Sequence, residues 1–169
     1  MRRILSLFAA SLTAAALVAM LMVSVAGASD SHPASNASDS RIFSATLTPD
    51  LGPNVEPTIA GIAPGGRPWV LKSGHVNLSR GGLLEVSVEG LLFAPDAGGN
   101  LPGTRDGITQ VSASLVCANG PVITTNPVEF SVTGNAQIHQ WLSLPAHCVG
   151  PIVLIRALSA GPWLAATGF

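Results

Sequence analysis

The stretch Leu84-Glu85-Val86-Ser87-Val88-Glu89 decides the fold, because aliphatic and polar side chains alternate along it at every step. Alternation with period two is the pattern of a β-strand that has one buried and one solvent-exposed face. The aliphatic side chains are therefore expected to point into a core, and Glu85, Ser87 and Glu89 to point toward water. No window beyond residue 40 shows the period of a long amphipathic helix.

The same alternation recurs between short segments rich in Gly, Pro, Asn and Asp, which are typical turn residues. This pattern predicts an all-β, single-domain antiparallel β-sandwich of about 8–10 short strands. The run from Ile152 to Ile155 is apolar at every position, which indicates a central strand covered on both faces. Strands are expected at residues 42–48, 57–62, 69–78, 83–93, 108–117, 122–125, 128–132, 136–144, 152–158 and 163–169.

The N-terminal residues carry the features of an export signal. Arg2 and Arg3 precede an apolar run that closes on Ala26-Gly27-Ala28, so residues 1–28 are predicted to form a cleavable signal helix. An uncleaved membrane anchor stays open as the alternative, because the run is long enough to span a bilayer. Residues 29–40 are polar and are expected to form a flexible linker, which leaves 41–169 as the folded domain.

This signal predicts a secreted, extracellular or cell-envelope protein with no stable membrane insertion after signal cleavage. The short Ala-rich signal and the single lysine, Lys72, favour a bacterial source. The formal net charge is −1 for the whole chain and −3 once Arg2 and Arg3 are removed, so a nucleic-acid partner is not expected. All three Met residues lie within the signal, which excludes a thioether copper site, and no cofactor is predicted.

Cys117 and Cys148 are the only cysteines, and in an exported chain two cysteines are most simply joined in one disulfide. Closing a loop of about 31 residues would stabilise the fold by roughly 3–4 kcal/mol. Cys117 shares the inward face of Val111, Ala113 and Leu115, so the disulfide is expected to be part of the core.

A first candidate site combines His75, Glu85 and Glu89 on one solvent-exposed face. The segment 79–82 reads as a hairpin turn, and an odd loop length would set His75 beside Glu85 or Ser87. An imidazole near a carboxylate can seed a metal site or act in general acid/base catalysis, which gives the alternative function of an exported hydrolase or metal-binding enzyme using His75 and Glu85. A solvated cross-strand pair is the plainer interpretation.

An enzyme is the less favoured hypothesis, because the chain contains no GxSxG, SxxK or HExxH motif. The histidines at positions 75, 139 and 147 do not show metal-ligand spacing, so no metal site and no catalytic residue is assigned.

A second candidate site is the face of the strand over 136–144 that carries His139 and Trp141. An outward Trp beside a His can stack on a sugar ring or contact a partner surface, unless a neighbouring loop covers it. Asp96, Asn100 and Asp106 lie in the long irregular segment 94–107, where binding functions are commonly placed, although their spacing does not match an EF-hand. These features predict a secreted or envelope-associated, non-catalytic β-sandwich module of unknown ligand, whose partner is an extracellular protein or a glycan.

Three segments carry a resemblance to a known family. They are Phe43-Ser44-Ala45-Thr46-Leu47, then Val55-Glu56-Pro57, then the stretch from Gly82 to Leu91. Together they resemble the opening of CHRD domains, which are secreted β-rich modules of mostly unknown function. The resemblance covers about the first third of the mature chain, and the His-x-His element that usually follows in that family is missing here. It implies a secreted β-rich module and assigns no site residue.

Overall fold

The computed structural model describes residues 40–53, 55–118 and 120–168. The predicted signal segment 1–28 and residues 29–39 of the predicted linker lie outside these residues. None of the described residues forms a helix, so no helix long and apolar enough to cross a membrane is found among them. The all-β prediction is confirmed, with eleven strands: β1 (Arg41–Pro49), β2 (Trp69–Val70), β3 (Ser73–Ser79), β4 (Leu83–Glu89), β5 (Leu92–Phe93), β6 (Gln110–Val116), β7 (Ile123–Thr124), β8 (Val128–Glu129), β9 (Ala136–Trp141), β10 (Ile152–Ala157) and β11 (Trp163–Thr167).

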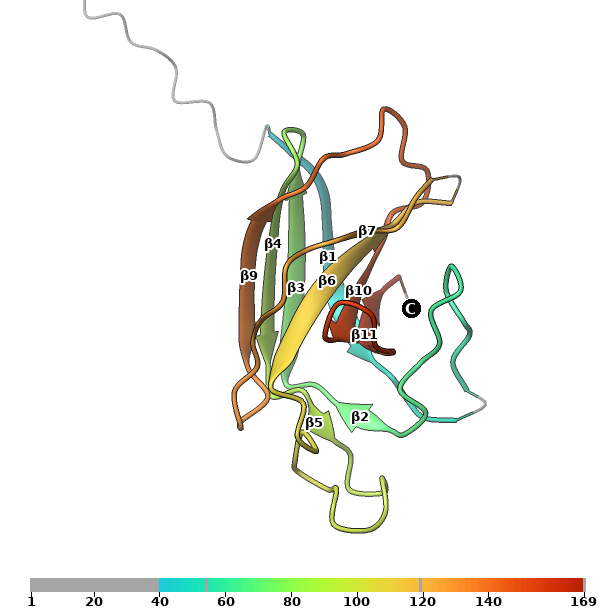
Figure 1. Ribbon diagram of the computed structural model, residues 1–169, viewed down its shortest axis with the longest axis vertical. Helices are drawn as coiled ribbons and strands as arrows, with labels where there is room; N and C mark the ends of the chain where they lie inside the picture. The colour runs from blue at the N-terminus through green and yellow to red at the C-terminus, as the bar shows by residue number, and fades with distance from the viewer. Residues whose placement is uncertain (1–39, 54, 119, 169) are drawn as a thin grey trace, which may run out of the picture. The chain divides into compact units, whose positions relative to one another are not determined.

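Nine of these strands form one antiparallel sheet with the order β7-β6-β10-β11-β1-β3-β4-β9, in which β8 also pairs with β6. The long strand β1 belongs to both halves of this sheet. Its residues from Arg41 to Thr46 pair with β3, whereas Leu47 to Pro49 pair with β11. The sheet curls about β1, so that β3, β4 and β9 lie across the core from β6 and β10 (Figure 1). β2 and β5 form a small second sheet.

The alternation in β4 assigns its two faces correctly. Leu84, Val86 and Val88 are buried in the main core, whereas Glu85 and Glu89 are exposed. The facing layer contributes its own inward residues to the same core: Val111, Ala113, Leu115, Val153 and Ile155. The core is therefore built by two layers of one curled sheet, each of which contributes one apolar face.

The central strand β10 is covered on both faces, as its apolar run predicts. It lies between β6 and β11, and Val153 and Ile155 face the main core. Leu154 points the other way and packs with Ile59 and Trp163 in a second apolar cluster on the outer face. The segment around Ile59 is thus the outer cover of β10.

The predicted strand at 57–62 is wrong, because this segment reverses direction in its middle. Ile59 and Ile62 pair with each other, and the two residues between them, Ala60 and Gly61, both have positive φ (49° and 79°). Two consecutive positive φ angles between paired residues are the mark of a tight type I′ turn. The predicted strands 69–78 and 83–93 are each divided in two, by bends at residues 71–72 and at Gly90.

Cys117 and Cys148 form a disulfide. Cys117 lies just after β6 and is packed in the main core, as its position in the alternation predicts. Cys148 lies in the connection between β9 and β10. The bond therefore ties the end of β6 to the connection between β9 and β10, which contains no strand.

Candidate binding face

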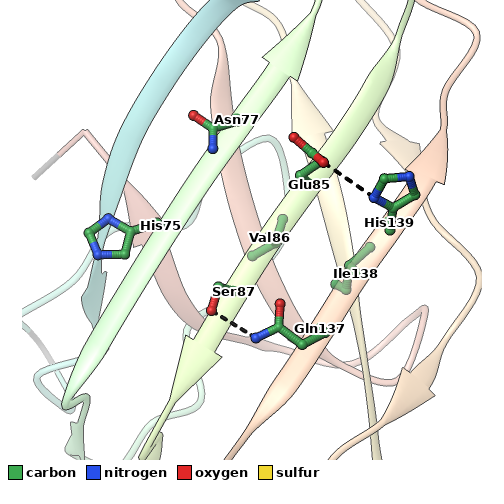
Figure 2. A pocket seen from close by; sticks show the side chains of 8 residues that line it. All are labelled: His75, Asn77, Glu85, Val86, Ser87, Gln137, Ile138 and His139. Carbon is green, nitrogen blue, oxygen red and sulfur yellow. Dashed lines mark hydrogen bonds and ion pairs between the residues drawn. The ribbon is translucent and has the colours of Figure 1, made fainter. Parts of the chain in front are cut away.

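The outward face of β3, β4 and β9 brings together side chains that the sequence could place only strand by strand. His75 of β3 lies opposite Ser87 of β4, and Ser87 lies opposite Gln137 of β9. In the next row, Asn77 lies opposite Glu85, and Glu85 lies opposite His139. These six residues, here called the polar face, surround a depression of about 270 Å³ (Figure 2).

Two contacts link neighbouring strands on the polar face. Oε1 of Glu85 lies 3.3 Å from Nδ1 of His139, and Nε2 of Gln137 donates a hydrogen bond of 2.8 Å to Oγ of Ser87 (Figure 2). The side chains of His139 and Glu85 are 68% and 51% exposed. An ion pair this exposed contributes at most about 1 kcal/mol to stability, so these groups remain free to exchange their contacts for those of a ligand.

The partner of Glu85 is His139 rather than His75. Of the two positions predicted for His75, the register places it opposite Ser87. Glu89 lies one row away from the depression, where its Oε2 accepts a hydrogen bond of 3.1 Å from Oγ of Ser73. The sequence does not show the Glu85–His139 pair because β4 and β9 are separated by more than forty residues, and no local pattern fixes such a pairing.

Trp141 lies at the end of β9 and is 70% exposed, so no loop covers it. Its indole ring lies beside Gly81 in the turn between β3 and β4, where an added Cβ would come within 3.2 Å of the ring atom Cζ3. Of the three tryptophans in the chain, Trp69 and Trp163 are buried, at 2% and 1% exposure. Trp141 therefore offers the only solvent-exposed indole.

The 94–107 segment does not join the polar face. Asp96, Asn100 and Asp106 are all exposed, and none of them lines the depression. Ala94 and Ala97 of the same segment are buried, and the carbonyl of Ala97 accepts a hydrogen bond of 2.7 Å from Nη1 of Arg67. Across the described part of the chain, no three His, Cys, Asp or Glu side chains gather closely enough to hold a metal ion.

Sequence reasoning missed two charged residues, Asp50 and Arg156, which are the only buried ones among those the structure describes. The Asp50 carboxylate accepts hydrogen bonds from the backbone N–H groups of Gly52 (2.9 Å) and Gly66 (3.2 Å). Burial raises the pKa of Asp50, and these backbone hydrogen bonds offset part of that rise. The Asp-x-Gly spacing of Asp50 and Gly52 is a sequence signal for a turn in which the Asp side chain accepts backbone hydrogen bonds. The signal for Arg156 is its position as the single charged residue of an apolar strand.

Comparisons with known proteins add no relative to these observations. No protein-family model, curated protein or solved structure matches the chain. The resemblance to CHRD domains therefore stays a prediction.

Proposed function

We propose that this protein is an exported, non-catalytic β-sandwich module that binds a glycan through the polar face and Trp141. The observation that carries the proposal is the exposed indole of Trp141 beside a row of hydrogen-bonding side chains on the same strand. Export is supported by the disulfide, which is typical of oxidising compartments, and by the predicted N-terminal signal. A bacterial source stays a prediction.

Sugar rings need two kinds of contact, and this face offers both. The C–H face of a ring stacks on an aromatic side chain, and its hydroxyl rim donates and accepts hydrogen bonds. Gln137, His139 and Trp141 follow one another on the same face of β9 in two-residue steps of about 7 Å. An oligosaccharide with one ring stacked on Trp141 would therefore have the imidazole of His139 and the carboxylate of Glu85 one step along the sheet, and the amide of Gln137 two steps along it.

The polar face is better suited to a glycan than to a protein. Stable protein interfaces have an apolar centre and bury about 800 Å² per partner. The centre of this face carries amide, hydroxyl, imidazole and carboxylate groups. The other large exposed apolar side chains lie on other segments: Ile42, Leu51, Val55, Val70, Val122, Val132, Val149 and Leu158.

Acrylamide quenching of tryptophan fluorescence tests the proposal, because Trp141 is the only indole that the quencher can reach. The purified protein is titrated with soluble β-glucan, xylan and a hexamer of N-acetylglucosamine. We expect one of them to protect the fluorescence from acrylamide, and Trp141→Ala to weaken binding by about tenfold or more in a pull-down on the same glycan.

Val132→Ala is the matched control, because Val132 is similarly exposed at 73% but lies in the turn before β9. It should bind as the unaltered protein does. Binding that survives Trp141→Ala, or a lack of protection by every glycan, would contradict the proposal.

The Glu85–His139 pair supports the second candidate, an exported hydrolase or metal-binding enzyme. That function would move the centre of the site from His75 and Glu85 to Glu85 and His139. Metal analysis of the purified protein, with Glu85→Gln, His139→Ala and His75→Ala, separates the two. A bound metal, or a hydrolytic activity that any of these changes removes, would replace the binding-module proposal.

A further inference from the structure

Arg156 is a buried cation on β10, an interior strand of the large sheet. It lies on β10, where it is opposite Ser112 on β6 and Trp163 on β11, and it is only 9% exposed. Because side chains alternate along a strand, Arg156 shares the outer face with Leu154. Arginine is seldom this deeply buried unless an anion accompanies it.

No anion of the described residues accompanies Arg156. Its Nε donates a hydrogen bond of 2.9 Å to the carbonyl of Gly161, and its Nη1 donates one of 3.4 Å to Oγ of Ser114. Both acceptors are neutral, and Arg156 forms no ion pair with any described carboxylate. A guanidinium carries five N–H donors, so these bonds leave donors on Nη1 and Nη2 unused.

The lost hydration of this cation has a cost that neutral acceptors do not fully offset. In accord with that cost, burial lowers the pKa of Arg156 below its ordinary value. The only other buried ionisable group in the described residues, Asp50, is engaged with the amides of Gly52 and Gly66. Arg156 therefore retains its positive charge without an internal counter-charge.

Arg156 opens onto a surface cavity of about 280 Å³. This cavity lies between the tight turn at residues 60–61 and the connection from β10 to β11. Its volume is near the lower limit for small-molecule sites. The other residues that line it are small or apolar, and none is acidic: Gly61, Ile62, Ala63, Ala160, Gly161 and Pro162.

We propose that this cavity binds a carboxylate group, which accepts hydrogen bonds from the unused donors on Nη1 and Nη2 of Arg156. The planar guanidinium presents two parallel N–H groups that match the two oxygens of a carboxylate. The lining offers one positive charge, which balances a monoanion, whereas a phosphate dianion would lack a second cation. The cavity lies beside the end of β10, whereas the polar face is on β3, β4 and β9, so this site is independent of the glycan proposal.

An NMR titration of the full-length protein tests the site. The amides of Gly61 and Gly161 and the Nε–H of Arg156 are followed while sodium acetate is added at constant ionic strength. Glucuronate and N-acetyl-dialanine then distinguish a sugar acid from a peptide C-terminus as the source of the carboxylate. We expect saturable shifts with acetate, weaker or no shifts with sulfate and phosphate, and tighter binding of one larger carboxylate.

Arg156→Gln should weaken acetate binding by about tenfold or more, as expected for the loss of charge-assisted hydrogen bonds. Arg80→Gln, which removes an exposed Arg from the turn between β3 and β4, should leave it unchanged. Shifts that are equal in Arg156→Gln, or sulfate or phosphate binding more tightly than acetate, would overturn the proposal.

Ala160→Asp gives a second test that keeps Arg156 in place. Ala160 is exposed and lines the cavity, so its replacement supplies a tethered carboxylate that should compete with acetate and abolish binding. Ser159→Asp is the matched control, since Ser159 is exposed in the same connection but does not line the cavity. Acetate binding that is unchanged in Ala160→Asp would overturn the proposal even if Arg156→Gln does not fold.

Discussion

Asp50 is the residue whose ionisation the fold disturbs most directly. Its carboxyl is fully buried, and burial raises its pKa above the ordinary value of 3.8. The folded protein therefore holds this proton more tightly than the unfolded chain does. The resulting contribution to stability is fully present below about pH 4 and is lost as the pH rises through the folded-state pKa.

Asp50→Asn should remove this pH dependence. In urea unfolding from pH 4 to pH 7, the free energy of unfolding of the unaltered protein should fall relative to that of the variant as the pH rises. The difference between the two curves should then become constant above the folded-state pKa. Asp96→Asn, at an exposed position, should run parallel to the unaltered protein, and parallel curves for Asp50→Asn would contradict the expectation.

Gly134 is a glycine whose site has no room for a side chain, because backbone atoms of Leu91 approach it closely. It has a φ of 76°, and an added Cβ would meet the carbonyl oxygen of Leu91 and lie 2.7 Å from its backbone nitrogen. Gly134→Ala should therefore destabilise the fold by more than about 3 kcal/mol. Gly99→Ala is the control in urea unfolding, because Gly99 has a similar φ of 63° with nothing within 4 Å, and it should cost only about 1–2 kcal/mol.

At the scale of the strand, the sequence predicts which face each side chain occupies far better than it predicts which strands pair. The alternation in β4 and β6 correctly placed Leu84, Val86 and Cys117 inward, because a strand's side-chain directions follow from its own residues. The pairing of β4 with β9 and the use of β1 by both halves depend on contacts distant in sequence. That is why the Glu85–His139 pair was not foreseen although both residues were singled out.

The strand predicted at 57–62 is wrong for a related reason. Its apolar residues Ile59 and Ile62 suit a strand, and only their packing against the outer face of β10 explains why the chain turns between them. Ala at a positive φ is not expected from sequence, since the left-handed region disfavours a side chain. The residue-level signal for the turn was Gly61 alone.

The disulfide connects two elements and gives a prediction at that scale. Cys117 and Cys148 close a loop of 31 residues, so reduction should lower the free energy of unfolding by about 3–4 kcal/mol. For a domain of this size that corresponds to a fall in the melting temperature of roughly 10 °C, measured by calorimetry with and without a reductant. The double variant Cys117→Ser with Cys148→Ser should melt at the lower temperature and be insensitive to the reductant. An unchanged melting temperature on full reduction would show that the bond adds no stability.

In the folded unit as a whole, the shared strand β1 predicts that the two halves of the sheet unfold together. The main core takes residues from both layers, and β1 is paired with β3 along one part and with β11 along the other. Neither half can therefore lose its pairing without exposing apolar surface of the other.

The buried indoles report on different regions, because Trp69 lies in the β2–β5 sheet and Trp163 in the outer cluster beside β10. In a Trp141→Phe background with the disulfide intact, urea unfolding followed by fluorescence and by far-UV circular dichroism should give one coincident midpoint. Two separate midpoints would mean that the halves are independent units, and that β1 joins them without coupling their stability.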